Sequence, residues 1–377
     1  MVLSNKEALS ISLPCNHLYF KKNLTETFQR LNELYNRQGL NKIYAQMNIP
    51  SQSLLNYRKS FPPGEINSPH TEDSIDFWFK YFNERLDIED DSMPCCYLSE
   101  FDQGLYAGLV GGEIKYITFS YDGLISSMVK PFIDDIHSVS NLKINTDHWL
   151  FKEYVNKLKI FAEKAKGNFG ISHFILIDSL NFLFELRGAT QSYLDVIENP
   201  ELVQVVIDFA LKLNLLIQNT FFQEIGLFNG GTFSTHVQWI QGRVISESVD
   251  PFHLTSVDFF EKWGIEPVEK IFSFYDGGII HLHSNGRHLL KKVSQIKGIK
   301  AVRLVDEPGN PPTISILSSL HPKRNSIPLV ISVPYQTFIS LLKKHQLYGN
   351  IFYMVDEVPD INTANNLMEK VRSYISE

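Results

Sequence analysis

The sequence contains little cysteine, no long apolar run and no excess of positive charge. Three of its 377 residues are cysteines, and Cys95 and Cys96 are adjacent, which excludes a disulfide framework and a Cys-x-x-Cys zinc knuckle. No apolar run is long enough to cross a membrane, and the first residues lack a signal-peptide pattern, so we expect a cytoplasmic protein. The net charge of −7 argues against binding nucleic acid through a broad basic surface.

Two nucleotide-binding signatures are also missing. No Gly-x-Gly-x-x-Gly follows the early predicted strands, and no Gly-x-x-x-x-Gly-Lys-Ser/Thr occurs. The composition is 44% apolar and 20% charged, which is typical of a globular protein with a well-filled core. A chain of this length forms either two average domains or one large domain.

Helix and strand patterns alternate from about residue 71 to the end of the chain. Apolar spacing predicts helices over 74–86, 147–167, 199–226 and 256–275, and strands over 91–99, 173–180, 277–283, 299–305, 328–333 and 350–355. This rhythm predicts a single α/β domain over 71–377, built as a (β/α)₈ barrel of the TIM type. Residues 1–70 are predicted to form an N-terminal helical extension, joined by a linker at 60–70 that is rich in Pro, Gly and Ser.

Polar side chains follow several of the predicted strands. Barrel enzymes carry their chemistry at the C-terminal ends of the strands, so we expect these side chains to converge on one mouth. The residues concerned are Glu100, Asp102, Asp178, His281, His283, Asp306, Glu307, Asp356 and Glu357.

Two histidines end the apolar run "GGIIHLH" at 277–283. Strand alternation places His281 and His283 on one face, where both imidazoles can bind one zinc ion. The alternative is one core histidine bonded to a carbonyl group and one exposed histidine.

A catalytic zinc site needs a third protein ligand and an open position. Asp356 or Glu357 can supply that ligand, or both can be solvated loop groups. Asp306 either orients a ligand histidine or belongs to a simple turn. Trp239 either walls a pocket or packs against the barrel rim.

Four segments resemble the uroporphyrinogen decarboxylase superfamily, specifically the decarboxylase-like branch that includes corrinoid-linked zinc methyltransferases. They are "DSMPCCYLSEFDQGLYAGLVGGEIKY", "FELRGATQSYLDVIENPELVQVVIDFALKL", "ISESVDPFHLTSVDFFEKWGIEPVEKI" and "GGIIHLHSNGRHLLKKVSQIKGIKAVRLVDEPG". The resemblance covers about residues 71–377 and implies the same barrel.

The resemblance implies a metal site and a substrate pocket. His281 falls on the first zinc ligand of the methyltransferases, and His283 and Asp356 fall on or next to two ligands that are normally cysteines. Zinc accepts such a set of two histidines and a carboxylate, although the loss of two thiolates leaves another metal, or none, as an alternative. The expected catalytic residues are His281, His283 and Asp306, and the expected substrate-binding residues are Glu100, Asp102, Trp239, Asp250 and Asn285.

The implied function is methyl transfer to or from a small molecule, with a corrinoid protein or cofactor as the methyl partner and the chain as a monomer or homodimer. The true porphyrinogen decarboxylases match less well, because their arginine-rich N-terminal motif has no counterpart in "SLPCNHLYFKKNLTETFQRL". A metal-free decarboxylase or lyase and a non-catalytic ligand-binding barrel are the alternatives.

Overall fold

The protein has an α/β fold around a parallel sheet. The computed structural model describes residues 17–118, 125–172, 175–177, 179–320 and 327–376. The predicted strand at 173–180 is described only in part, and Asp178, expected at the mouth, lies outside the described residues. No described helix is both long and apolar enough to cross a membrane.

Seven strands form the central sheet in the order β1-β14-β13-β12-β11-β10-β7, and each pairs in parallel with its neighbours. Most of their side chains are buried, as expected for a parallel sheet that is covered on both faces. The strands are β1 (Ile43–Met47), β7 (Ile175–Ile177), β10 (Ile245–Ser248), β11 (Gly278–Leu282), β12 (Ile299–Leu304), β13 (Leu329–Pro334) and β14 (Ile351–Asp356).

Three smaller sheets accompany it. A two-stranded parallel sheet pairs β3 (Cys95–Cys96) with β6 (Gly170–Ile171), so the strand expected over 91–99 is much shorter than predicted. The other two sheets are antiparallel and consist of β2 (Gly64–Ile66), β4 (Ile114–Thr118) and β5 (Ile125–Val129), and of β8 (Gly231–Ser234) and β9 (Gln238–Gln241).

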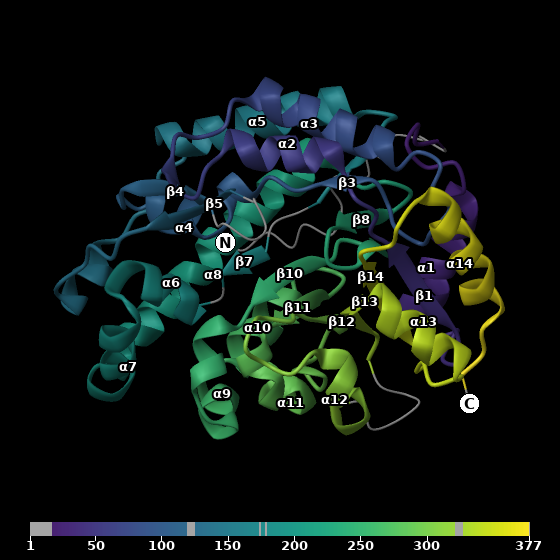
Figure 1. Cartoon of the computed structure of the whole chain (residues 1–377). Coiled ribbons are helices and arrows are strands. Elements are labelled where there is room, and N and C mark those ends of the chain that lie inside the picture. The colour runs from purple at the N-terminus through teal and green to yellow at the C-terminus, as the bar shows by residue number, and fades with distance from the viewer. Residues whose placement is uncertain (1–16, 119–124, 173–174, 178, 321–326, 377) are drawn as a thin grey trace.

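Helices surround the strands on the outside of the molecule (Figure 1). The long amphipathic helices expected over 147–167 and 199–226 are confirmed as α5 and α8. The α-helices are α1 (Leu24–Tyr35), α2 (Gln52–Ser60), α3 (Thr71–Glu84), α4 (Gln103–Gly108), α5 (Trp149–Ala165), α6 (Ser179–Arg187), α7 (Ala189–Glu198), α8 (Pro200–Ile225), α9 (Val257–Trp263), α10 (Ile265–Phe272), α11 (Leu290–Val293), α12 (Thr313–Leu320), α13 (Tyr335–Lys343) and α14 (Ile361–Ser373).

The segment before residue 71 supplies more than helices. Its strand β1 pairs with β14 along the full length of β1, so the expected helical extension contains a strand of the central sheet. The other edge of β1 is bonded by the turn at 90–91. The backbone N–H groups of Ala45 and Met47 donate to the carboxylates of Asp91 and Asp90 at 2.9 and 2.8 Å, and the Asp91 N–H donates to the Ala45 carbonyl at 2.9 Å.

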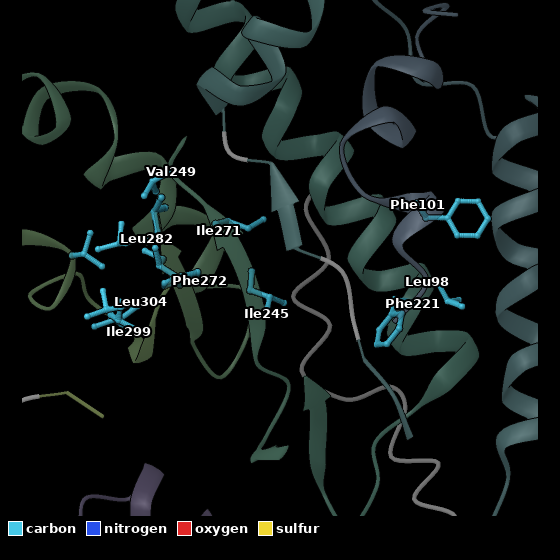
Figure 2. Close-up of a cluster of buried hydrophobic side chains, with 14 of the residues drawn as sticks. Leu98, Phe101, Phe221, Ile245, Val249, Ile271, Phe272, Leu282, Ile299 and Leu304 are labelled. Carbon is cyan, nitrogen blue, oxygen red and sulfur yellow. The ribbon is translucent and has the colours of Figure 1, made fainter. Parts of the chain in front are cut away.

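Apolar side chains fill the space between helices and strands. Figure 2 shows part of this core, in which Ile245 and Leu282 of the sheet lie near Ile271 and Phe272 of α10. A second buried cluster includes Tyr44, Ile279, Val330 and Phe352 from four strands of the sheet. This packing fixes the strands rigidly, and the polar residues at their C-terminal ends are held in place with them.

Candidate metal centre

Three side chains at the C-terminal ends of the neighbouring strands β10 and β11 lie close together. His283 Nε2 lies 3.2 Å from His281 Nε2, and Asp250 Oδ1 lies 3.5 Å from His281 Nε2 and 3.6 Å from His283 Nε2. Among the described residues, these three form the group of His, Cys, Asp and Glu side chains close enough to share one ion. We call them the His-His-Asp triad.

Strand register explains why the triad assembles. In the parallel pair of β10 and β11, Ser248 lies opposite His281, so their side chains leave the sheet on the same side. His283 lies two residues beyond His281 in extended backbone, so alternation brings it to that same side, whereas Asp250 begins the short 3-10 helix Asp250–Leu254 that follows β10. The triad therefore depends on the pairing of β10 with β11 and on the 3-10 helix that follows β10.

The distances within the triad fit a metal ion. Ligand atoms that lie ~2.0–2.1 Å from a tetrahedral zinc ion are about 3.3–3.4 Å from one another. The three observed distances, 3.2, 3.5 and 3.6 Å, bracket that value. Asp250 Oδ1 is buried and accepts no hydrogen bond from the described residues, which leaves its lone pairs for a ligand. Three protein ligands would leave one position open for a reactant.

Glu307, rather than Asp306, contacts a triad histidine. The Nδ1 atom of His283 lies 2.9 Å from Glu307 Oε1, a hydrogen bond that directs Nε2 toward the triad. The other Glu307 oxygen accepts from the Ser284 backbone N–H at 3.2 Å. Asp306 accepts instead from Arg287 at 2.6 Å and from the Thr313 hydroxyl. The expectation that Asp306 orients a ligand histidine is therefore wrong, because the guanidinium and hydroxyl groups hold it elsewhere.

Two further histidines, His253 and His236, lie next to the triad. His253 Nδ1 lies 3.6 Å from Asp250 Oδ1, and the ring of His236 stacks on that of His281 with centroids 5.7 Å apart. Gly286 makes room for His253, since a Cβ atom at this position would lie 2.2 Å from His253 Cδ2. The Ser-Asn-Gly after the histidine strand thus includes a glycine that the histidine cluster requires.

The electrostatics of the site favour the protonation states that bind metal. Burial lowers the pKa of His281, and it lowers the pKa of His253 to about 4. Burial alone would raise the pKa of Asp250, but the imidazoles of His281, His283 and His253 and a hydrogen bond from Ser248 hold it below its ordinary value. The lowered pKa values favour the neutral imidazoles of His281 and His253 and the ionised carboxylate of Asp250, which are the forms that ligate metals.

Asp356, the carboxylate expected from the sequence as third ligand, is not part of the triad. Its Oδ1 accepts a hydrogen bond from Asn48 Nδ2 at 2.8 Å, and it lines a cavity at the ends of β1 and β14. Asp250 occupies the position expected for Asp356. The reason is register: Asp250 follows the strand next to β11, whereas three strand pairings separate β11 from β14.

The remaining predicted pocket residues have different surroundings. Glu100 is buried beside the Lys157 ammonium at 3.5 Å, and Asp102 accepts hydrogen bonds from Ser126 and Ser127. Trp239 is 1% exposed and donates from Nε1 to the Phe228 carbonyl, so it packs in the core. Asn285 is exposed on the surface, where its backbone carbonyl bonds to His288.

A cavity of about 480 Å³ opens beside the strand ends of β1 and β14. One wall is aromatic and comes from α3, with Phe77, Trp78, Tyr81 and Phe82. Polar side chains also line the cavity, including Gln46, Asn48, Gln238 and Asp356. Thr235 also lines the cavity, and its neighbour in sequence, His236, stacks on His281.

No protein-family model matches the sequence, and no curated protein matches it. Fourteen chains of solved structures do match in fold. One is a methyltransferase from Methanosarcina mazei, with a TM-score of 0.57 over 94% of this chain and 99% of that chain. This chain shares that fold. The two sequences are 12% identical, so the likeness concerns the fold alone.

Sequence reasoning identified both histidines but missed their partners. Asp250 was expected in the substrate pocket, and the roles of His253 and Glu307 were not foreseen. One signal was present: "SVDPFH" places an aspartate and a histidine directly after the strand that precedes the histidine strand. Neighbouring parallel strands end at the same edge of a sheet, which made Asp250 the nearer carboxylate.

Proposed function

We propose that this chain is a metal-dependent methyltransferase that works with a corrinoid partner or cofactor on a small molecule. Its metal would be Zn²⁺, bound by His281, His283 and Asp250. The observation that carries the proposal is the His-His-Asp triad, whose ligand atoms lie at zinc-like separations in a chain with the fold of a methyltransferase.

Each residue of the site has a defined part in this proposal. A zinc ion bound here would act as a Lewis acid that lowers the pKa of a thiol or hydroxyl group on the methyl acceptor. Glu307 accepts from His283 Nδ1 and so keeps the Nε2 lone pair directed at the triad. Asp250 offers one negative charge where two thiolates would offer two, which leaves more positive charge at the metal. The cavity beside the strand ends would hold the acceptor.

We also infer that the strands close into a (β/α)₈ barrel. Strands β6 and β7 lie in one short stretch of chain and pair with β3 and β10, respectively. Asp90 and Asp91, which precede β3 in the sequence, accept hydrogen bonds from the backbone of β1 and so connect the β3 side of the molecule to β1. Eight strand positions would then surround the buried cluster that includes Tyr44 and Phe352.

The decisive experiment measures bound zinc in matched variants by elemental analysis. We expect about one zinc per wild-type chain, a loss in His281→Ala and Asp250→Asn, and no change in Asp356→Asn. His137→Ala is the control, because this histidine is exposed and lies outside the cluster. Glu307→Gln should weaken zinc binding by roughly 10–100-fold.

Activity is then tested with methylcobalamin as the methyl donor and a thiol as the acceptor, by the change in cobalamin absorbance. Zinc-loaded wild type should turn over, and His281→Ala should not. Equal zinc content in wild type and His281→Ala would remove the metal from the proposal.

A metal-free decarboxylase is the second candidate, favoured by the same cluster. A carboxylate 3.5 to 3.6 Å from three imidazole nitrogens can also perform general acid–base chemistry without a metal. This candidate predicts release of carbon dioxide from an acidic substrate that continues in the presence of a chelator.

A further inference from the structure

A buried arginine on β12, the strand next to the histidine strand, has no close charged partner among the described residues. Arg303 is 9% exposed, and its Nη2 donates to the Ser332 hydroxyl at 2.8 Å. Its Nη1 has no hydrogen-bond partner among the described residues, and no carboxylate of the described residues lies within 4.0 Å of the guanidinium. Burial lowers the pKa of Arg303 to about 10, so it remains a cation at neutral pH.

The two nearest carboxylates are held by other groups. Asp306 bonds to Arg287 at 2.6 Å, and Asp356 bonds to Asn48 at 2.8 Å. Both carboxylates raise the pKa of Arg303, but only by electrostatic interaction across space. A buried cation without a close counter-charge or a full set of acceptors costs folding free energy, so the fold must retain it for another reason.

Strand register directs this side chain to the site. Arg303 on β12 lies opposite His281 on β11, so both side chains leave the sheet on the same side. Ser332, which holds one end of the guanidinium, lies opposite Met354, and Met354 lines the cavity. Arg303 therefore leaves the sheet on the same side as His281 and as Met354, which lines the cavity.

We propose that Arg303 binds an anionic group of the substrate, so that the substrate is a small acid whose other end reaches the His-His-Asp triad. This inference rests on the proposed function and specifies its substrate class. The shared chemistry is an oxyanion, either a carboxylate or a tetrahedral group such as a phosphate or sulfonate. Nη1 supplies two N–H donors toward it, and Ser332 fixes the plane of the guanidinium.

The test uses metal-free protein and isothermal titration calorimetry. Sodium acetate and sodium sulfate are titrated in separate arms at constant ionic strength. We expect wild type to bind at least one of them saturably, Arg303→Gln to bind it at least tenfold more weakly, and Arg303→Lys to fall between the two. The tighter arm assigns the anion as a carboxylate or as a tetrahedral oxyanion.

Arg243→Gln is the matched control, since Arg243 donates to Asn219 and stacks over Phe222, away from the triad. It should bind both anions as wild type does. An absence of saturable binding by wild type, or equal binding by wild type and Arg303→Gln, would overturn the inference.

Stability gives a second readout. Without added anions, Arg303→Met should melt at or above the wild-type temperature, because it removes an uncompensated buried charge. A clearly lower melting temperature would show that Arg303 has a structural role and would also overturn the inference. Zinc binding is measured separately, by elemental analysis of the same variants after they are loaded with zinc and freed of excess metal. If the protein binds the anion but no zinc, the proposed function is wrong and this inference stands. If it binds zinc but has no anion site that depends on Arg303, this inference is wrong and the proposed function stands.

Discussion

Single residues in this site act mainly by how they place one another. Glu307 orients His283, the lack of a side chain at Gly286 leaves room for His253, and the surrounding imidazoles lower the pKa of Asp250. None of these partners is adjacent in sequence to the group it affects. Small changes at such positions should therefore have large and specific effects.

Gly286→Ala should disturb the histidine cluster. The new Cβ would lie 2.2 Å from His253 Cδ2 and 2.5 Å from its Nε2, so the ring must move. We expect a loss of about 1–3 kcal/mol in the free energy of unfolding, measured by urea denaturation. The double variant Gly286→Ala with His253→Ala removes the clash and should recover part of that loss. Additive effects of the two changes would show that this contact is unimportant.

Glu185 should make stability fall as pH rises. Burial and the nearby Asp102 carboxylate raise the pKa of Glu185 to about 8, so the folded state keeps a proton that the unfolded state has released above about pH 4.3. Between these two values the folded state binds more protons, and stability decreases with a limiting slope of about 1.4 kcal/mol per pH unit.

Urea denaturation at pH 5, 6, 7 and 8 measures this slope. Glu185→Gln should flatten it, whereas Glu198→Gln, at an exposed position, should not change it. Parallel profiles for Glu185→Gln and wild type would contradict the expectation.

At the scale of elements, two buried carboxylates accept hydrogen bonds from the edge of β1 that a neighbouring strand would otherwise accept. Asp91 receives the Ala45 backbone N–H at 2.9 Å and two guanidinium donors of Arg30, at 2.5 and 3.0 Å, and so joins α1 to the edge of β1. Asp90 accepts the Met47 backbone N–H in the same way and forms ion pairs with Arg85 and Lys21. Carboxylates can satisfy backbone donors at a sheet edge as a neighbouring strand would.

Asp91→Asn should therefore be costly. The amide keeps the shape of the side chain but leaves the buried Arg30 cation without its counter-charge. We expect a loss of about 3–5 kcal/mol in the free energy of unfolding. Asp87→Asn breaks an exposed ion pair with Lys22 and should leave the free energy of unfolding unchanged within error. Similar losses in both variants would indicate that burial of the pair is not what matters.

At the scale of the whole molecule, zinc binding should stabilise the fold. The triad joins two neighbouring strands of the sheet, and it forms only when β10 and β11 are paired. A ligand that binds the folded state alone adds about 2.7 kcal/mol to the free energy of unfolding at a free concentration 100 times its Kd. Thermal melts with buffered zinc should show this gain in wild type and His137→Ala, but not in His281→Ala. An equal gain in all three would place the zinc elsewhere.

The sequence by itself determined the local features of this protein. Apolar periodicity predicted α5, α8 and β11, and it placed His281 and His283 on one face, because both properties depend on residues a few positions apart. The same local patterns indicated an α/β fold with a parallel sheet.

Tertiary structure alone decided which side chains meet at that face. Asp250 and Glu307 are 31 and 24 residues from His281 and His283, respectively, and Arg303 is 22 residues from His281. Their positions depend on strand order and register, which the packing of the whole core fixes and no short stretch of sequence encodes. For that reason the carboxylates after every strand looked equivalent in the sequence, and folding selected the one beside the histidine strand.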